Sequence, residues 1–193
     1  LLTHTGPAFC SGAALDEMLG GATTDGTRDM LALFRKLLTL PVPVVALVDG
    51  AARAGGIGVL GSCDVVIASA RSTFAFTEVR LGLAPAVISL PLRPLLTARA
   101  ASRYFLTGET FDAATAVEIG LVSLVGEDAS PVLDGLRRAD RQGLSETRPL
   151  TTRDRLRAID TDGVAMAELS GRLFSSPVAQ AHFSAFLERR GRR

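Results

Sequence analysis

Cysteine and histidine are scarce in this sequence, which has only Cys10, Cys63, His4 and His182 among its 193 residues. Two cysteines are too few for a disulfide framework, so we expect reduced thiols and a cytoplasmic protein. None of these residues belongs to a cluster with the spacing of metal ligands, so the sequence predicts no metal site. For the two lone histidines, a structural role is favoured over a ligand or catalytic role.

Long apolar runs and a strong charge imbalance are also absent. No apolar stretch reaches the roughly 20 residues that a membrane span needs, so we expect no membrane partner. The net charge is only +1, and the one dense basic run lies between Arg189 and Arg193, where a solvated tail is the favoured interpretation. A nucleic-acid-binding protein would need a clustered basic face, so we expect no nucleic-acid partner.

Strand and helix patterns alternate over the first two thirds of the sequence. The segment Thr27 to Leu40 has its apolar residues at helical spacing, and Val44 to Val48 is continuously apolar and β-branched, as in a strand buried on both faces. Further helices are predicted at 54–62, 92–106 and 111–119, and further strands at 64–69, 73–76 and 121–125. Beyond these, only helices are predicted, at 131–144, 151–158, 164–174 and 177–190.

This order of elements predicts an α/β core followed by a helical extension, with a division near residue 130. We assign residues 1–130 to the core and residues 131–193 to the helical region. The chain begins Leu1-Leu2-Thr3 without a methionine, as though inside a strand. We therefore expect that an N-terminal part of the core is missing from this sequence. The composition of Gly20 to Gly26 is that of a flexible linker.

Two glycine-containing turns are candidate sites for binding a carbonyl oxygen that gains negative charge. Ser11-Gly12-Ala13 and Ala54-Gly55-Gly56 each open a predicted helix. Glycine lets the backbone turn an N–H group toward a ligand, and the helix N-terminus adds a favourable dipole. A donor aimed at such an oxyanion contributes roughly 3–4 kcal/mol. Tight packing is the favoured explanation of such glycines, so the turns alone do not identify a site.

Glu78 is the candidate for proton transfer. It follows the apolar segment Phe74-Ala75-Phe76 and precedes Val79, and such surroundings raise the pKa of a carboxyl group toward the range that acid–base catalysis uses. The alternative is an ordinary glutamate in water, or one in a salt bridge with Arg80. From these residues alone the two interpretations are evenly balanced.

Four ordered motifs give the sequence a family resemblance. They are AFCSGAALDEM, PVPVVALVDGAARAGGIGVLGSCDVVIAS, STFAFTEVRLGLAP and YFLTGETFDAATAVEIGLV. Together they resemble the enoyl-CoA hydratase/isomerase (crotonase) superfamily, in particular its bacterial enoyl-CoA hydratase-like members. The final FSAFLERR resembles the C-terminal segment of that family, so the resemblance extends from about Thr5 to Arg190.

The resemblance implies a ClpP/crotonase-type spiral of ββα turns with a helical C-terminal trimerisation region, assembled as a homotrimer or homohexamer. It implies an acyl-CoA thioester substrate and no metal or redox cofactor. The matching oxyanion-hole donors are the N–H groups of Ala13 and Gly55. Ala14, Leu15 and Asp16 match the segment that touches the CoA part of the substrate. Glu78 matches the second of the two catalytic glutamates of the hydratases.

Three positions depart from the family pattern. Gly58 stands where the first hydratase glutamate would be, Ala14 replaces a usual aspartate, and Val87-Ile88-Ser89 replaces a glycine pair. We expect Gly58→Glu to raise hydration of short enoyl-CoAs, unless the pocket has been rebuilt around this position. Met30, Phe34 and Leu37 are candidates to line an acyl-tail pocket, although core packing is the simpler interpretation.

The sequence therefore predicts an enzyme that hydrates 2-enoyl-CoA thioesters in fatty-acid or sterol side-chain degradation, with a single glutamate. An alternative is an enoyl-CoA isomerase that uses Glu78 alone, because one carboxylate can take a proton from one carbon and return it to another. A second alternative is a non-catalytic acyl-CoA-binding homologue. The acyl chain length cannot be predicted from these residues.

Overall fold

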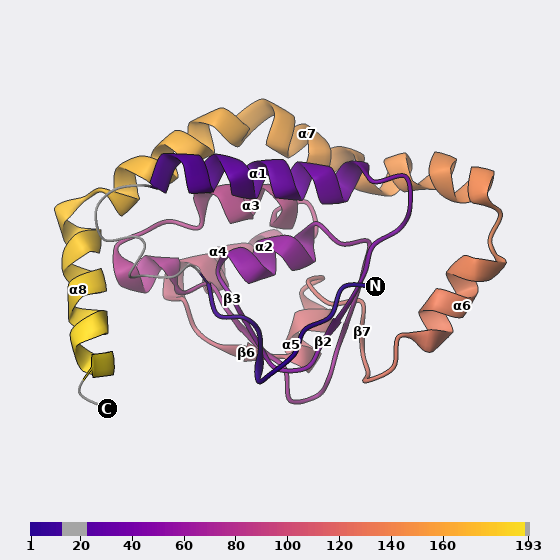
Figure 1. The fold of residues 1–193 in the computed structure, drawn as a ribbon, viewed down its shortest axis with the longest axis horizontal. Helices are drawn as coiled ribbons and strands as arrows, with labels where there is room; N and C mark the ends of the chain where they lie inside the picture. The colour runs from indigo at the N-terminus through magenta and orange to yellow at the C-terminus, as the bar shows by residue number, and fades with distance from the viewer. Residues whose placement is uncertain (13–22, 192–193) are drawn as a thin grey trace.

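The computed structural model describes residues 1–12 and 23–191 of the chain. In Figure 1, two long helices cover the top of the molecule and two small sheets lie beneath them. This is the mixed α/β architecture with a helical C-terminal region that the element order predicts.

The strands form two sheets, and all of their pairings are parallel except one. The first sheet has the order β2–β4–β7 and the second the order β1–β3–β5–β6, in which only β5 and β6 are antiparallel. The strands of the first sheet are β2 (Val45–Val48), β4 (Val65–Ala68) and β7 (Leu124–Val125). Those of the second are β1 (Ala8–Cys10), β3 (Ala51–Arg53), β5 (Thr73–Ala75) and β6 (Phe111–Asp112).

From β1 to β5, successive strands alternate between the two sheets, which produces a ββα repeat. Strands β2 and β3 are followed by α2 (Gly55–Gly61). In the next turn of the spiral, β4 and β5 are followed by the 3-10 helix η1 (Thr77–Leu81) and by α3 (Ala86–Leu92). At the first crossing, Gly50 has a φ of 149°, and a Cβ there would overlap the carbonyl oxygen of Pro7. Glycine is therefore needed where the chain passes between the sheets.

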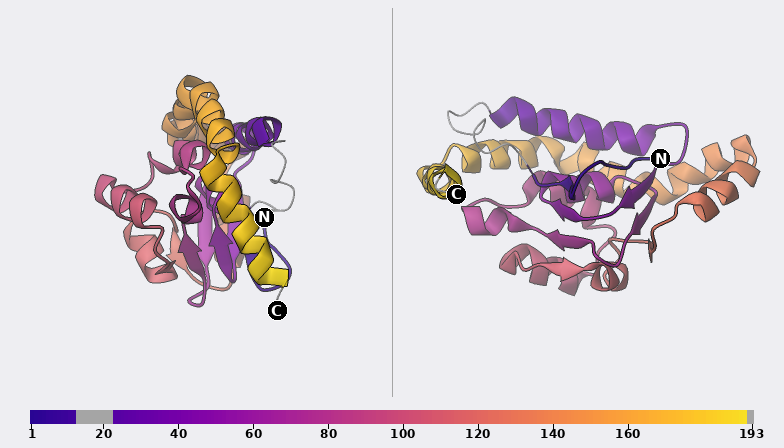
Figure 2. Two further views of the ribbon diagram at one scale, coloured as in Figure 1. Left: turned by 90° about the vertical axis from the view of Figure 1, so that its left-hand side faces the viewer. Right: turned by 60° about the horizontal axis from the view of Figure 1, so that its bottom comes forward.

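Helices α1 (Thr23–Thr39) and α7 (Arg141–Phe174) run side by side along the top of Figure 1, and α7 also packs on α3. Helix α8 (Pro177–Gly191) descends at one end, while α6 (Ser130–Arg138) stands at the other. Figure 2 shows α4 (Ala98–Thr107) and α5 (Ala113–Glu118) on the far side of the sheets from α1 and α7. The largest core side chains include Phe34, Phe74 and Phe76, all fully buried.

The predicted helix boundaries are wrong in three places. The helix expected at 92–106 begins only at Ala98, as α4, because the side chain of Thr97 caps it by accepting a hydrogen bond from the N–H of Ala100, and α3 ends at Leu92. The helix expected at 131–144 is interrupted after Arg138, where α6 ends, and α7 begins at Arg141. Conversely, the segments predicted separately at 151–158 and 164–174 belong to the single 34-residue helix α7. Gly163 does not break it, because this glycine is buried beside Leu31 of α1.

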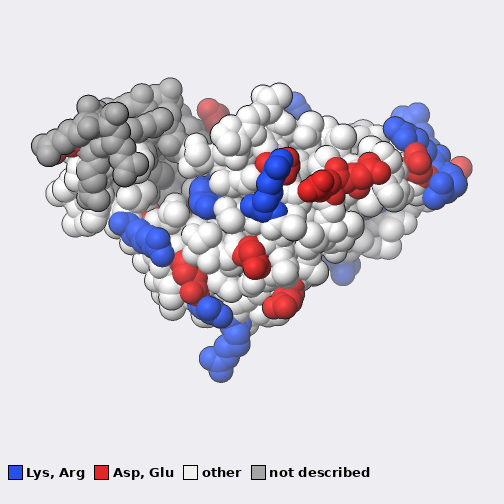
Figure 3. Space-filling view, turned by 90° about the horizontal axis from the view of Figure 1, so that it is seen from below, with Lys and Arg blue, Asp and Glu red and all other residues white. Residues whose placement is uncertain are grey.

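The distribution of charged side chains agrees with the small net charge of the sequence. On the face drawn in Figure 3, basic side chains are interspersed with acidic ones over its described surface. Among the helices of residues 23–191, none combines the length and apolarity that crossing a membrane requires.

Cys10 and Cys63 are free, and burial raises the pKa of the Cys63 thiol to about 12. Residues 131–193 form most of α6 and the helices α7 and α8, and their role in trimerisation stays a prediction.

Candidate active site

Three neighbouring parallel strands bring the predicted site residues to one edge of a sheet. Ala8 and Cys10 of β1 pair with Ala51 and Ala52 of β3, and β3 pairs in turn with β5. Because parallel strands point the same way, the segments that follow them leave the sheet at the same edge. These segments are Ser11-Gly12, Ala54-Gly55 and Phe76-Thr77-Glu78. The topology thus unites parts of the chain that are more than 60 positions apart.

A cavity of about 830 Å³ opens at this edge, which is a size suited to a small-molecule ligand. It contains both Gly55 and Glu78. Among its described lining residues, Glu78 is the only carboxylate, while Arg53 and Arg80 carry positive charge. Most of the remaining lining is apolar or small: Met30, Leu81, Leu83, Ala84, Pro85, Ala86, Val87, Ile88, Phe174, Phe186 and Leu187.

The turn before α2 has an unusual backbone. Ala54 has φ 47° and ψ −122°, and it is the one described residue other than glycine with a positive φ. A non-glycine residue in this region carries strain, and such strain concentrates at functional sites. Gly55 follows as the first residue of α2, so its N–H has no acceptor within the helix. The strained turn therefore leaves a backbone donor beside the cavity.

Gly55 is also packed tightly. A Cβ at this position would approach Cε of Met30 to 2.8 Å. Gly55 is therefore tightly packed and also lies at the cavity, since Met30 itself lines the cavity. The end of the Met30 side chain is flexible, so this contact is adaptable.

The first glycine turn meets the second. Gly12 has a φ of 102°, and a Cβ there would lie 3.5 Å from Cβ of Ala54. Ser11 and Gly12 both line the cavity. The predicted donor Ala13 and the predicted CoA-contacting residues Ala14, Leu15 and Asp16 lie outside the described residues, so their assignments stay predictions.

Glu78 is held in the first turn of η1 with only 8% of its surface exposed. Burial raises the pKa of its carboxyl group to about 7, and its own backbone N–H opposes this shift. The Oε2 atom is buried and has no hydrogen-bond partner within the described part of the chain. A carboxyl group with a pKa near neutrality and a free oxygen can both accept and return a proton, as acid–base catalysis requires.

The two arginines of the cavity do not pair with Glu78. Among the described residues no ion pair joins Arg80 to Glu78, and Nε of Arg80 donates instead to the carbonyl oxygen of Thr107, so the alternative of a Glu78–Arg80 salt bridge is wrong. Arg53 is half-buried and donates to the carbonyl oxygens of Ala52 and Thr73 at 2.9 and 2.6 Å. These bonds fix its guanidinium at the end of β3.

Gly58 lies beneath an aromatic ring. A Cβ at this position would overlap Cζ of Phe34 and come within 3.0 Å of Cε2 of the same ring and 3.1 Å of Cγ2 of Ile88. Phe34 is fully buried and Ile88 nearly so. Core side chains therefore occupy the space at the position that the resemblance matches to the first hydratase glutamate. A glutamate there would collide with them unless they move, and the effect of Gly58→Glu on hydration stays a prediction.

The three candidates for an acyl-tail pocket have different surroundings in the structure. Met30 lines the cavity, whereas Phe34 and Leu37 belong to the core or pack against it. Four further lining residues were not identified from the sequence: Ser170, Phe174, Phe186 and Leu187 of α7 and α8. In the sequence, Phe186 has the spacing of a helix packing face, but its side chain is 44% exposed and contributes to the cavity wall. Helical spacing alone cannot distinguish these two roles.

No group of three or more His, Cys, Asp or Glu side chains within residues 1–12 and 23–191 is arranged to hold a metal ion. The groups that the described part of the site offers for chemistry are one buried carboxylate and backbone donors at glycine turns.

Comparisons with known proteins agree with this architecture. The chain is 46% identical to an enoyl-CoA hydratase from Mycobacterium avium of known crystal structure, with a TM-score of 0.88 over 96% of this chain and 74% of that one. An enoyl-CoA hydratase from Shewanella pealeana is 31% identical with a TM-score of 0.74, over 97% of this chain and 75% of that one. The fold is thus that of crotonase-type enoyl-CoA hydratases, as predicted.

Curated relatives are longer than this chain. It is 31% identical over 172 residues to an enoyl-CoA hydratase from Alternaria alternata, a match that covers 86% of this chain and 58% of the relative. A mitochondrial enoyl-CoA hydratase domain-containing protein from Danio rerio is 34% identical over 65% of this chain and 45% of its own length. The chain thus spans about half the length of the curated relatives that it matches.

The sequence pattern of one family extends over nearly the whole chain. The pattern described as Enoyl-CoA hydratase/isomerase matches residues 1–192. Together with the spiral fold and the cavity at the ends of β1, β3 and β5, this match shows that the chain belongs to the enoyl-CoA hydratase/isomerase family.

Proposed function

We propose that this protein is an enoyl-CoA hydratase that adds water across the double bond of a 2-enoyl-CoA thioester, with Glu78 as its one acid–base carboxylate. The observation that carries the proposal is the position of Glu78: a buried carboxyl group with a pKa of about 7 in the same cavity as the strained turn at Gly55. The hydratase names of several relatives support the choice of reaction. Degradation of fatty acids or sterol side chains is the proposed metabolic role.

In the proposed reaction, the N–H groups of Gly55 and Ala13 bind the thioester carbonyl oxygen. Glu78 takes a proton from water, and the water oxygen bonds to C3 while the electron pair of the double bond moves toward the carbonyl. The enolate oxygen then holds the negative charge, which the two N–H donors stabilise. Glu78 finally returns the proton to C2, so that one carboxylate serves as base and then as acid.

The remaining site assignments are part of the same proposal. Ala14, Leu15 and Asp16 contact the CoA part of the substrate, and no metal or redox cofactor takes part. The protein assembles as a homotrimer or homohexamer through its helical C-terminal region. Its compartment is the cytoplasm.

A second reaction is favoured by one specific observation. Phe34, a core residue, fills the space beside Gly58, so no second carboxylate fits at the position that the resemblance matches to the other hydratase glutamate. An isomerase needs no water: Glu78 removes a proton from C2 of a 3-enoyl-CoA and returns it to C4, and the double bond moves into conjugation. The same cavity and the same carboxylate support this alternative.

The two reactions have opposite optical signals. The conjugated thioester absorbance falls when a trans-2-enoyl-CoA is hydrated and rises when a 3-enoyl-CoA is isomerised. We expect a fall with 2-enoyl-CoAs in a screen from short chains to sterol-like acyl groups. A rise with 3-enoyl-CoAs and no change with 2-enoyl-CoAs would replace hydratase by isomerase. Binding of acyl-CoA without turnover of either substrate would leave only an acyl-CoA-binding protein.

A further inference from the structure

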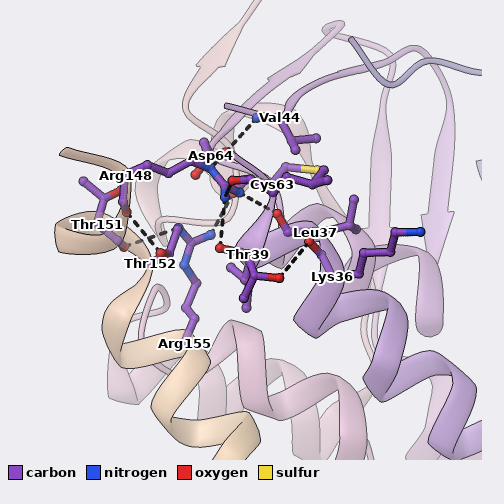
Figure 4. Close-up of polar contacts among 12 residues, drawn as sticks. Lys36, Leu37, Thr39, Val44, Cys63, Asp64, Arg148, Thr151, Thr152 and Arg155 are labelled. Carbon is purple, nitrogen blue, oxygen red and sulfur yellow. Dashed lines mark hydrogen bonds and ion pairs between the residues drawn. The ribbon is translucent and has the colours of Figure 1, made fainter. Parts of the chain in front are cut away.

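Two arginines of α7 are buried, which is unusual for this residue type. Arg148 is 6% exposed and Arg155 is 4% exposed. By contrast, the side chains of Arg153 and Arg157 on the same helix are 67% and 68% exposed. Figure 4 shows Arg148 and Arg155 pointing from α7 into the body of the molecule.

The buried guanidinium groups bind the backbone at the ends of two other helices. Arg148 donates to the carbonyl oxygens of Leu37, Leu38 and Leu40, at and just beyond the end of α1, and its Nε donates to Oδ2 of Asp64 at 2.9 Å. Nη1 of Arg155 donates to the carbonyl oxygens of Gly61 and Cys63, at the end of α2, at 3.0 and 2.7 Å.

The last carbonyl groups of a helix receive no hydrogen bond from an N–H of the same helix. A cation beside them also interacts favourably with the helix dipole. The arginines satisfy several of these groups at once, on α1 and on α2. Stability alone does not require such an arrangement, because well-packed apolar side chains often stabilise a core as well as buried charges do. A buried guanidinium does, however, fix the helix ends that it binds.

These two helices control the geometry beside the cavity. Met30 and Phe34, one turn apart on α1, face Gly55 and Gly58, one turn apart on α2. A Cβ at either glycine would collide with the facing side chain, so the two helices are as close as glycine allows. A relative shift of α1 and α2 would therefore move the backbone of Gly55. Displacements of about 1 Å at a reacting centre can lower a rate 100-fold.

We propose that Arg155, together with Arg148, is a positioning residue: α7 holds the ends of α2 and α1 and thereby fixes the N–H of Gly55 relative to Glu78. This inference rests on the proposed role of Gly55 as an oxyanion donor. Neither arginine touches the substrate, since neither lines the cavity among the described residues.

The test compares Arg155→Met, Arg155→Gln and Arg155→Lys with the matched control Arg153→Met, all in the full chain. Turnover of a trans-2-enoyl-CoA or 3-enoyl-CoA is expressed per acyl-CoA-binding site, so that unfolded protein does not count. We expect Arg155→Met and Arg155→Gln to lower kcat at least tenfold with KM changed less than threefold. An interaction that acts only in the transition state has this signature. Arg155→Lys recovers kcat to within threefold of wild type, and Arg153→Met leaves it unchanged.

Hydrogen exchange gives a readout that does not depend on activity. The amides of residues 55–61 should exchange faster in Arg155→Met and Arg155→Gln than in wild type, relative to the amides of β4 as an internal reference. Unchanged exchange at 55–61, or unchanged kcat in a folded variant, would overturn the positioning role. Failure of both variants to fold would also overturn it, because Arg155 would then act on the fold as a whole.

The outcome separates this inference from the proposed function. Wild-type protein that turns over neither substrate rejects the proposed function, and hydrogen exchange then decides the positioning role by itself. Wild-type turnover together with undiminished turnover in the Arg155 variants rejects the positioning role alone.

Discussion

Gly55 and Gly58 lie three positions apart on α2, but their surroundings differ. Gly55 lines the cavity, and the atom nearest to it is the flexible end of Met30. Gly58 faces the fully buried ring of Phe34. The same residue type therefore serves ligand access at one place and helix packing at the other. In the proposed mechanism, α2 therefore supplies a backbone donor at Gly55, whereas core side chains occupy the space beside Gly58.

The largest effect is expected from removing the carboxylate of Glu78, the one carboxylate in the described lining of the cavity. We expect Glu78→Gln to lower kcat by about three orders of magnitude, because general acid–base catalysis contributes 10²–10⁴-fold and the described lining has no second carboxylate. The change in conjugated thioester absorbance measures this loss. Glu118→Gln, an exposed position on α5, is the matched control and should keep full activity. Activity that survives Glu78→Gln would remove Glu78 from the mechanism.

A second prediction concerns the pH dependence of stability. The pKa of Glu78 is about 7 in the folded state against an ordinary 4.5, so the folded protein binds more protons than the unfolded chain between these values. Stability contributed by this group is therefore present below about pH 4.5 and is lost as pH rises to 7. The Glu78→Gln variant keeps its stability over this pH range, because glutamine does not ionise. We expect equal stability at pH 4 and a gain on the order of 3 kcal/mol for the variant at pH 8.

Thermal and urea unfolding of wild type and Glu78→Gln at the two pH values measure this difference. Glu118→Gln again serves as the control, since an exposed carboxyl group should not change the pH dependence. Parallel stability curves for wild type and Glu78→Gln would show that the Glu78 pKa is not raised by folding.

A third prediction addresses the packed glycine. Gly58→Ala should destabilise the protein by about 1–3 kcal/mol, because the methyl group forces the buried Phe34 ring from its position. Gly135→Ala on α6 is the matched control: nothing lies within 4 Å of its Cβ, and helix propensity predicts a gain of about 0.5–1 kcal/mol. Urea unfolding of the two variants gives the comparison. A neutral or stabilising Gly58→Ala would contradict the close packing of α1 on α2.

Much of this organisation could be predicted from the sequence, because its signals are local. The apolar run before Asp49 gave a buried strand, the turn Ala54-Gly55-Gly56 gave the start of a helix, and Glu78 stood in apolar surroundings. The ordered motifs then led to the family, which the comparisons confirm.

Other features depend on contacts between distant segments and have no local signal. The ring that fills the space at Gly58 comes from α1, and the cavity wall includes Phe174 and Phe186 of the C-terminal helices. The buried Arg148 and Arg155 look like any surface arginines in the sequence, since only the fold brings them to the ends of α1 and α2. The interruption predicted near Gly163 is absent for a similar reason, because packing overrides the low helix propensity of this glycine within α7.

The most direct test of the central claim, that Glu78 is the single acid–base group of the site, is the pH dependence of kcat/KM. The free enzyme needs Glu78 ionised to accept the first proton, so kcat/KM should rise tenfold per pH unit in acid and level off above a single pKa near 7. A profile that is flat from pH 5.5 to 8.5, or one that Glu78→Gln leaves unchanged, would contradict the account.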